Sequence, residues 1–322
     1  MRPALRALWA WLNRWFAWIA LVGVVIGLAL AVRSQWDAIT ELDWAGSWPV
    51  LLGSAALFAV APLAQASTSW IILRQLGARA PFPEAMAIWA NSYVLRYAPS
   101  GALALVYRVR ERERVNATRE QIVASEAYEN LGSMTAGACA LLIGFAALGT
   151  FPPWLGLAVA VPVVVVAVAV RPRFLGRFAQ ALLARFGVDT PLLMGRHLVV
   201  AVLVNLVAWI ATGFGFLALL NGLTDEPSPG LMWAIATYSV GYLVGFVTPF
   251  LPGGLGAREG TLVAVLAPRY GAGAATGIAL AARLAVTVGE AIAVCLIWLG
   301  YAATRAVTGR DRSRLPSADG PP

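Results

Sequence analysis

The sequence contains little charge, one histidine and two cysteines. Only 12% of its 322 residues are charged, and every one of the 24 basic residues is an arginine. Cys139 and Cys295 have neither metal-ligand nor disulfide-framework spacing, and His197 stands alone. So few ligands exclude zinc and haem sites, and the sequence has no Ser/His/Asp set, nucleotide-phosphate loop or GxGxxG motif. We therefore expect no metal and no cofactor.

Hydrophobic residues are present in excess. They make up 60% of the chain, and the mean hydropathy is +0.74, which is more apolar surface than a soluble domain can bury. The stretches that carry no charge and can span a bilayer core of about 30 Å are 15–32, 48–73, 154–170 and 198–224. Two further spans, 118–150 and 272–302, carry charged residues. The sequence therefore predicts an all-α, polytopic membrane helix bundle with six full spans.

The arginines indicate how this bundle is oriented. Nineteen of the 24 fall in loops on one predicted side, only Arg33 and Arg269 fall on the other, and the opposite loops are acidic. This positive-inside pattern predicts the cytoplasmic membrane of a bacterium with both termini in the cytoplasm, and it argues against a nucleic-acid partner. We expect residues 1–310 to form one transmembrane domain, followed by a disordered tail at 311–322.

Two segments fit neither a loop nor a simple span. Residues 83–107 and 227–268 are apolar, but proline and glycine interrupt each of them, which ends a helix. The interrupting residues are Pro99, Gly101, Pro249 and Pro252. At membrane depth such a break is tolerated only inside protein or beside water, so we interpret both segments as re-entrant hairpins. The alternative is eight spans, in which each segment crosses twice.

The two broken segments resemble each other in sequence. Residues 93–104 read YVLRYAPSGALA and residues 246–257 read FVTPFLPGGLGA, with four identities and an aromatic residue conserved at two more positions. Three predicted crossings separate the segments, so their orientations are opposite. This arrangement indicates an inverted repeat, with one copy at 48–150 and the other at 198–302. The alternative is chance similarity between two Gly/Pro breaks.

Five of the charged residues at predicted membrane depth stand out, because each costs about 2.5–3.5 kcal/mol on insertion scales. They are Glu126, Glu129, Arg258, Arg283 and Glu290. Glu126 and Glu129 are three residues apart and share a helix face, and Arg283 and Glu290 form a similar stripe on another helix. We expect the carboxylate helix to face the arginine helix. This charge network either serves function or only fixes helix packing and register.

Arg258 follows the second break directly, where a new half-helix begins. Backbone N–H groups at such an end suit an anion, and a guanidinium suits phosphate, so we predict a lipid-phosphate site where the two hairpin tips meet. Glu259 is expected either to hold Arg258 or to accept from a ligand amine. The predicted lipid- or anion-binding residues are Arg258, Glu259, Gly253, Gly254, Gly256, Arg96 and Tyr93.

The string LPGGLGAREG at 251–260 resembles the lysylphosphatidylglycerol synthase/flippase transmembrane family. Looser similarities are the Tyr93 hairpin, Glu126 or Glu129 in the next helix, and Arg283 in the last helix. The chain departs from the family pattern at its first break, Pro-Ser-Gly, and at Asn130, where an arginine is expected. Full-length members of this family carry a cytoplasmic aminoacyltransferase domain, which we do not expect in these 322 residues.

The resemblance implies handling or translocation of a lipid rather than its synthesis. The expected partners are membrane lipids, either an anionic phospholipid or a polyprenyl-linked intermediate. Two other classes stay open. One is a membrane enzyme that transfers a group to or from a lipid, with Glu129 or Glu259 as base. The other is a scaffold for a separate lipid-modifying enzyme.

Overall fold

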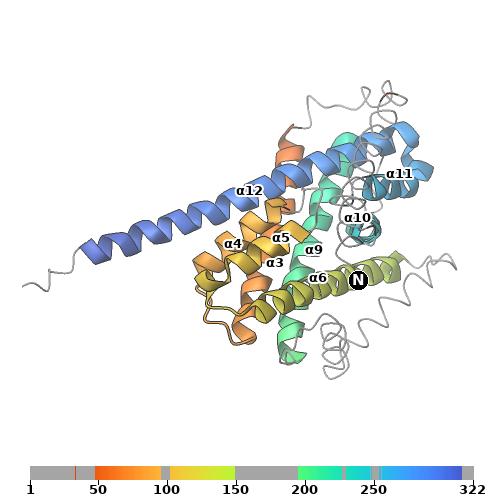
Figure 1. The fold of residues 1–322 in the computed structure, drawn as a ribbon. Helices are drawn as coiled ribbons and strands as arrows, with labels where there is room; N and C mark the ends of the chain where they lie inside the picture. Colours follow the sequence, from red (N-terminus) through yellow and green to blue (C-terminus); the bar gives the residue numbers. More distant parts are fainter. Residues whose placement is uncertain are drawn as a thin grey trace, which may run out of the picture.

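The computed structural model describes residues 33, 48–95, 102–148, 195–226, 230–246, 248, 254 and 256–313 (Figure 1). All regular structure in these residues is helical, as predicted. The helices are α3 (Trp48–Gln75), α4 (Phe82–Leu95), α5 (Ala102–Arg110), the 3-10 helix η1 (Arg112–Val115), α6 (Arg119–Leu148), α9 (Gly195–Leu223), α10 (Leu231–Phe246), α11 (Ala257–Tyr270) and α12 (Ala272–Ser313). The predicted spans 15–32 and 154–170 lie outside the described residues.

Among the described residues, three helices are long and apolar enough to cross a membrane, and they coincide with predicted spans. They are Trp48–Gln75, Val199–Leu223 and Ala272–Val307. Helix α6 has 30 residues, but its first half carries acidic side chains. The α12 helix continues to Ser313 and so includes the first three residues of the predicted 311–322 tail.

Each half of the chain has the same order of helices, namely long, short, short and long. Helices α3, α4, α5 and α6 have 28, 14, 9 and 30 residues, and α9, α10, α11 and α12 have 29, 16, 14 and 42. At 1.5 Å per residue, the short helices extend for about 14–24 Å, less than the roughly 30 Å of a bilayer core. The short helices meet where the sequence predicts the breaks, although the breaking prolines themselves lie outside the described residues.

Helices α3 and α9 lie side by side and run in opposite directions (Figure 1). Near the start of α3, the Ser54 hydroxyl donates to the Gly215 carbonyl at 2.9 Å. Further along α3, Thr68 accepts a hydrogen bond from the Asn205 amide at 3.3 Å. The residue numbers of the contacts thus increase along α3 while they decrease along α9, so the two helices are antiparallel. This pair joins the two halves of the molecule.

The other helices pack around this pair in a reciprocal way. Helix α12 of the second half packs on α3 and α4 of the first, and α6 of the first half packs on α9 and α10 of the second. Within each half, the two short helices pack on each other, as α4 does on α5 and α10 on α11. Exchanging the halves therefore preserves the main helix contacts.

Small residues allow the helices to approach closely where they cross. A Cβ added to Gly289 of α12 would lie 2.5 Å from the Ala55 carbonyl oxygen of α3. A Cβ on Gly144 of α6 would lie 2.6 Å from the Met232 carbonyl oxygen of α10. Such contacts are typical of helix packing in membranes, where close van der Waals fit drives association.

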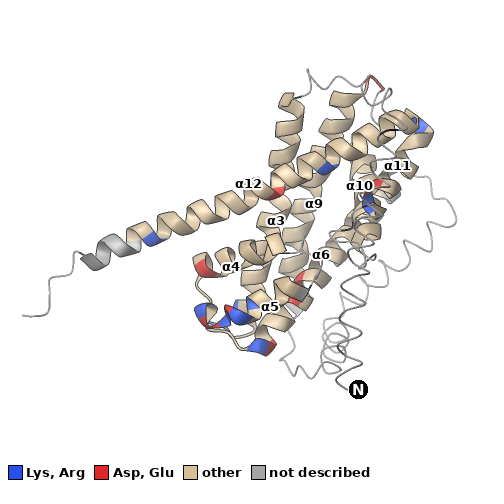
Figure 2. Cartoon of the chain, turned by 45° about the horizontal axis from the view of Figure 1, so that its top comes forward, with Lys and Arg blue, Asp and Glu red and all other residues tan. Residues whose placement is uncertain are grey.

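The outer surface of the bundle is apolar. On α9, for example, the exposed side chains recur every three or four residues and are Val199, Leu203, Val207, Ile210 and Phe214. A helix that is apolar on its outward face as well as its packed face is suited to lipid. By contrast, the charged residues cluster around α5, η1 and the start of α6 (Figure 2).

We predict that Gly289→Ala destabilises the bundle while Gly53→Ala does not. Alanine gains up to about 1 kcal/mol of helix propensity at either position. At Gly289 the methyl group meets the α3 backbone, and overpacking of this kind costs about 1–3 kcal/mol. Gly53 is the matched control because no atom lies within 4 Å of its added Cβ. Thermal aggregation of the purified variants in detergent measures the difference, and equal midpoints would contradict the α12–α3 contact.

Candidate functional site

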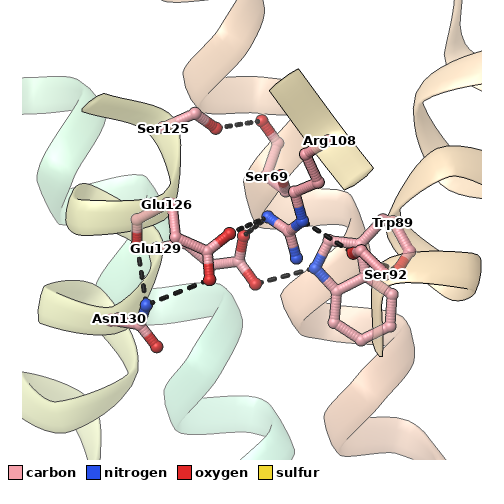
Figure 3. A network of polar contacts seen from close by, with 8 residues as sticks. All are labelled: Ser69, Trp89, Ser92, Arg108, Ser125, Glu126, Glu129 and Asn130. Atoms are coloured by element: carbon pink, nitrogen blue, oxygen red, sulfur yellow. Dashed lines mark hydrogen bonds and ion pairs between the residues drawn. The ribbon is translucent and has the colours of Figure 1, made fainter. Parts of the chain in front are cut away.

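Two polar clusters lie within this apolar bundle, one in each half. The first, the Arg108 cluster, consists of Trp89, Ser92, Arg108, Glu126 and Glu129, which converge from α4, α5 and α6 (Figure 3). Three of these side chains carry charge, and Arg108 and Glu129 are among the buried residues of the protein. Charge is held at this site only because its members neutralise and hydrogen-bond one another.

Arg108 is at the centre of this cluster. Its Nε donates to the Ser92 hydroxyl at 2.7 Å, and its Nη1 donates to Glu129 Oε2 at 2.8 Å. The same Nη1 lies 2.6 Å from Glu126 Oε2. The indole N–H of Trp89 donates to the second Glu129 oxygen, Oε1, at 2.7 Å. Both oxygens of Glu129 therefore accept strong hydrogen bonds, one of them from a cation.

Local sequence explains why α6 presents its carboxylates here. Thr118 and Gln121 form a reciprocal cap at the start of α6, with bonds of 2.8 and 3.2 Å between each side chain and the other residue's backbone N–H. This cap fixes where the helix begins. Glu126 and Glu129 then follow on one face, and the Asn130 amide donates to the Glu126 carbonyl at 2.9 Å and to its Oε1 at 3.4 Å.

The partner predicted for these carboxylates was wrong. We expected them to face an arginine of the 272–302 helix, but in the structure they pair with Arg108. The sequence places Arg108 in an arginine-rich run, where it resembles its solvated neighbours. Only the packing of α5 against α4 and α6 turns this one guanidinium inward, whereas Arg110 and Arg114 are exposed.

Trp89 connects the Arg108 cluster to the second half of the chain. Its ring is 2% exposed and stacks on the ring of Tyr93 with centroids 4.4 Å apart. The Tyr93 hydroxyl donates to Glu290 Oε1 of α12 at 3.1 Å. Three predicted site residues, Glu129, Tyr93 and Glu290, are thus linked through a tryptophan that sequence reasoning did not single out.

The second cluster, the Arg258 cluster, consists of Tyr238, Tyr242, Gly245, Gly254 and Arg258. The guanidinium carbon of Arg258 lies 4.5 Å from the ring centroid of Tyr238 and 5.6 Å from that of Tyr242. Arg258 is 7% exposed, so two aromatic faces stabilise a largely desolvated cation. The sequence predicted Arg258, but the two tyrosines one turn apart on α10 were missed.

Glycines bring the backbone close to Arg258. Gly254 has a φ of +68°, and a Cβ added to it would lie 2.9 Å from the Gly245 backbone. A side chain at 254 is therefore excluded both by its conformation and by space. A Cβ on Gly245 would in turn lie 3.2 Å from the Cβ of Arg258.

Glu259 has a different role from the two that we expected. Its Oε2 accepts the backbone N–H of Gly256 at 2.7 Å and so caps α11, and its Oε1 lies 3.6 Å from Arg283 Nη1. It thus does not pair with Arg258. Gly256, predicted to offer its N–H to an anion, gives that donor to Glu259 instead. Arg96 and Gly253, also predicted, lie outside the described residues.

The ion pairs in the two halves have opposite polarity. In the first half the arginine is on the second short helix and the carboxylates are on the long helix α6. In the second half Glu259 is on the second short helix and Arg283 is on the long helix α12. In the part of the chain that the structure describes, no group of three His, Cys, Asp or Glu side chains could hold a metal ion.

We predict that Arg108→Ala destabilises the protein by about 3–5 kcal/mol, because it leaves buried carboxylates without their cation. Adding Glu126→Gln and Glu129→Gln to that variant should restore part of the loss. Arg112→Ala is the control, since Arg112 pairs at 3.4 Å with a Glu113 side chain that is 85% exposed. Thermal unfolding in detergent reports the four proteins, and an Arg108→Ala variant as stable as Arg112→Ala would contradict the pairing.

The chain matches a family model over most of its length. The model describes the lysylphosphatidylglycerol synthase transmembrane region and matches residues 15–293. No sequence among curated proteins matches the chain. The matched residues include every member of the Arg108 and Arg258 clusters, and both lie in an all-helical bundle with membrane-spanning helices. The chain therefore belongs to the lysylphosphatidylglycerol synthase transmembrane family and is a membrane protein.

Proposed function

We propose that this protein binds a phospholipid or polyprenyl-linked lipid inside the bilayer and moves it between the leaflets without altering it covalently. The observation that carries the proposal is Arg258, a buried guanidinium held between two tyrosine rings beside a glycine-lined backbone. Family membership supports lipid handling in general. The setting of Arg258 supports a phosphate ligand, because a guanidinium offers a bidentate fork to phosphate oxygens.

The contacts of Arg258 with aromatic rings suit a site that binds its ligand reversibly. Contact with the two ring faces offsets part of the cost of a desolvated cation. The ion pair that neutralises Glu259 uses Arg283, so Glu259 does not compete for Arg258. A lipid phosphate would add a favourable ionic contact to Arg258 at a depth where water is scarce.

The architecture supports movement between leaflets. The four short helices suit two re-entrant hairpins, and the antiparallel α3 and α9 suit an inverted repeat about an axis between them. In such folds the ligand site lies near the bilayer midplane, and rocking of one repeat against the other opens it to either side. The Tyr93–Glu290 bond joins α4 to α12 and would be one of the contacts that changes.

A membrane enzyme is the second candidate, with Glu129 or Glu259 as its base. The hydrogen bonds disfavour it. Both Glu129 oxygens accept bonds, from Arg108 and Trp89, and both Glu259 oxygens contact donors, in Gly256 and Arg283. A general base needs a lone pair directed at its substrate. Either carboxylate would have to lose one of these contacts before it could act as a base. Translocation requires no such loss.

Arg258→Lys tests the phosphate site, because lysine keeps the charge but loses the planar fork and most of the stacking. In liposomes containing labelled anionic phospholipid, we expect movement between leaflets to fall about tenfold for Arg258→Lys and further for Arg258→Ala. Arg269→Lys is the matched control, since Arg269 also lies over a tyrosine ring, that of Tyr270 at 5.8 Å, but outside the cluster.

The outcomes of this assay separate the candidates. Wild-type activity in both Arg258 variants would overturn the phosphate site. Appearance of a new lipid species would support the enzyme. A stable complex with a lipid-modifying enzyme and no lipid movement would support the scaffold.

Topology is tested by cysteine labelling from either side of the membrane, in a background with Cys139 and Cys295 replaced by alanine. The proposed hairpins predict that Ser100→Cys and Thr248→Cys react weakly with impermeant reagents from both sides. Thr248 is chosen because a cysteine at Gly254 would clash with Gly245. Strong labelling of Ser100→Cys from outside only would show that 83–107 crosses the membrane twice.

A further inference from the structure

The Arg108 cluster contains one cation and two carboxylates. Glu126 Oε2 and Glu129 Oε2 lie 2.6 and 2.8 Å from the same nitrogen, Arg108 Nη1, so the two oxygens are no farther apart than the sum of these distances (Figure 3). The remaining polar neighbours, Trp89, Ser92 and Asn130, are neutral. With both carboxylates ionised, the cluster would carry a net charge of −1.

In the part of the chain that the structure describes, the helices around α6 bring no second cation to the cluster, since Arg74 of α3 and Arg110 of α5 are exposed. Of the helices that pack on α6, the stretches 48–73 of α3, 199–223 of α9 and 231–246 of α10 contain no Asp, Glu, Lys, Arg or His. On α5, the neighbouring Tyr107 hydroxyl accepts a bond from Asn91 instead. Trp89 stacks on Tyr93, and Tyr93 in turn contacts the carboxylate of Glu290 on α12.

Burial makes this excess charge costly. The side chains of Arg108 and Glu129 are 8% and 7% exposed, and that of Glu126 is 26% exposed. Two carboxylates that share one partner in a poorly solvated site oppose each other's ionisation, and one proton then belongs to the pair. When the carboxylate pair takes up this proton, no uncompensated charge remains buried in the cluster.

The hydrogen bonds indicate which carboxylate holds the proton. Both oxygens of Glu129 already accept bonds from N–H donors, so an added proton there would compete with one of these bonds. Glu126 Oε2 is close to Arg108 Nη1 but has no hydrogen bond of good geometry. Glu126 is also the more exposed of the two, so a proton can reach it.

A small cavity of about 10 Å³ lies beside the cluster. Its lining includes Arg108, Trp89, Ser69 and Ser125 and is otherwise apolar. The Ser125 hydroxyl donates to the Ser69 carbonyl at 3.4 Å and marks the wall next to the carboxylates (Figure 3). A space of this size has room for at most one water molecule.

We propose that Glu126 and Glu129 form a proton-binding site in which one exchangeable proton, carried at neutral pH by Glu126, brings the Arg108 cluster to electrical neutrality. Loss of the proton leaves the cluster with a charge of −1. In a membrane protein that changes conformation, this difference makes the neutral form easier to enclose and the charged form easier to expose to water. The site does not depend on whether the protein moves lipid.

Infrared spectroscopy of the protein in lipid nanodiscs tests this site directly. The C=O stretching band of a protonated carboxyl group lies at a different frequency from the bands of a carboxylate. This band shifts in D₂O, whereas the bands of lipid esters do not. Labelling with ¹³C-glutamate assigns the band to the protein. We expect the wild type to show this band at neutral pH and to lose it in alkali. Glu126→Gln should abolish it, and Glu113→Gln should keep it, because the Glu113 side chain is 85% exposed.

Glu129→Gln provides a second, independent variant. It removes the like charge, so Glu126 should ionise beside Arg108 and the band should again disappear at neutral pH. Elution as a single species on size exclusion establishes folding, and if Glu126→Gln does not fold, Glu129→Gln decides alone. A wild type without the band at neutral pH, or a band that survives in a folded Glu126→Gln or Glu129→Gln variant, would overturn the proposal.

Discussion

The cost of burying charge in an apolar helix bundle is the constraint on which this structure depends. In the first half, this cost is lowered by contacts of Arg108 with two carboxylates and a serine hydroxyl. The Trp89 indole donates to the Glu129 oxygen that Arg108 does not contact. That arrangement fixes how α4, α5 and α6 meet. A short helix such as α5, with nine residues, has too few turns to be stable on its own in this position, so the ionic contacts largely define its place.

The same constraint is met differently in the second half. There Arg258 is covered by aromatic faces, while Glu259 caps its own helix and contacts Arg283. The main packing contacts are shared by both halves, but the polarity of their ion pairs is reversed. The Arg108 cluster holds two carboxylates and one guanidinium, whereas the Arg258 cluster is built around a guanidinium, and the Tyr93–Glu290 bond connects the two halves. The proposed lipid and proton sites follow from this division.

The sequence predicted the class of fold and most charged members of the site, because both follow from the free-energy cost of placing polar or charged groups in an apolar environment. Uncharged apolar runs predicted α3 and α9, and the price of intramembrane charge singled out Glu129, Arg258 and Glu290. Partner choice was not predictable, because Arg108 is one of several arginines in a row and only packing turns it inward. The aromatic partners, Trp89 and Tyr238, were missed. Local sequence in an apolar helix does not distinguish an aromatic residue that contacts a buried charge from one that lies at the membrane interface.

The central claim is that Arg258 is kept in the bundle to bind a lipid phosphate. A structure determined experimentally in nanodiscs made from native membrane tests it most directly. We predict density for a phosphate within hydrogen-bond distance of the Arg258 guanidinium, between α10 and α11, with its acyl chains leaving along an apolar face. Lipid density confined to the outer surface, with the Arg258 site filled by protein side chains alone, would contradict the account.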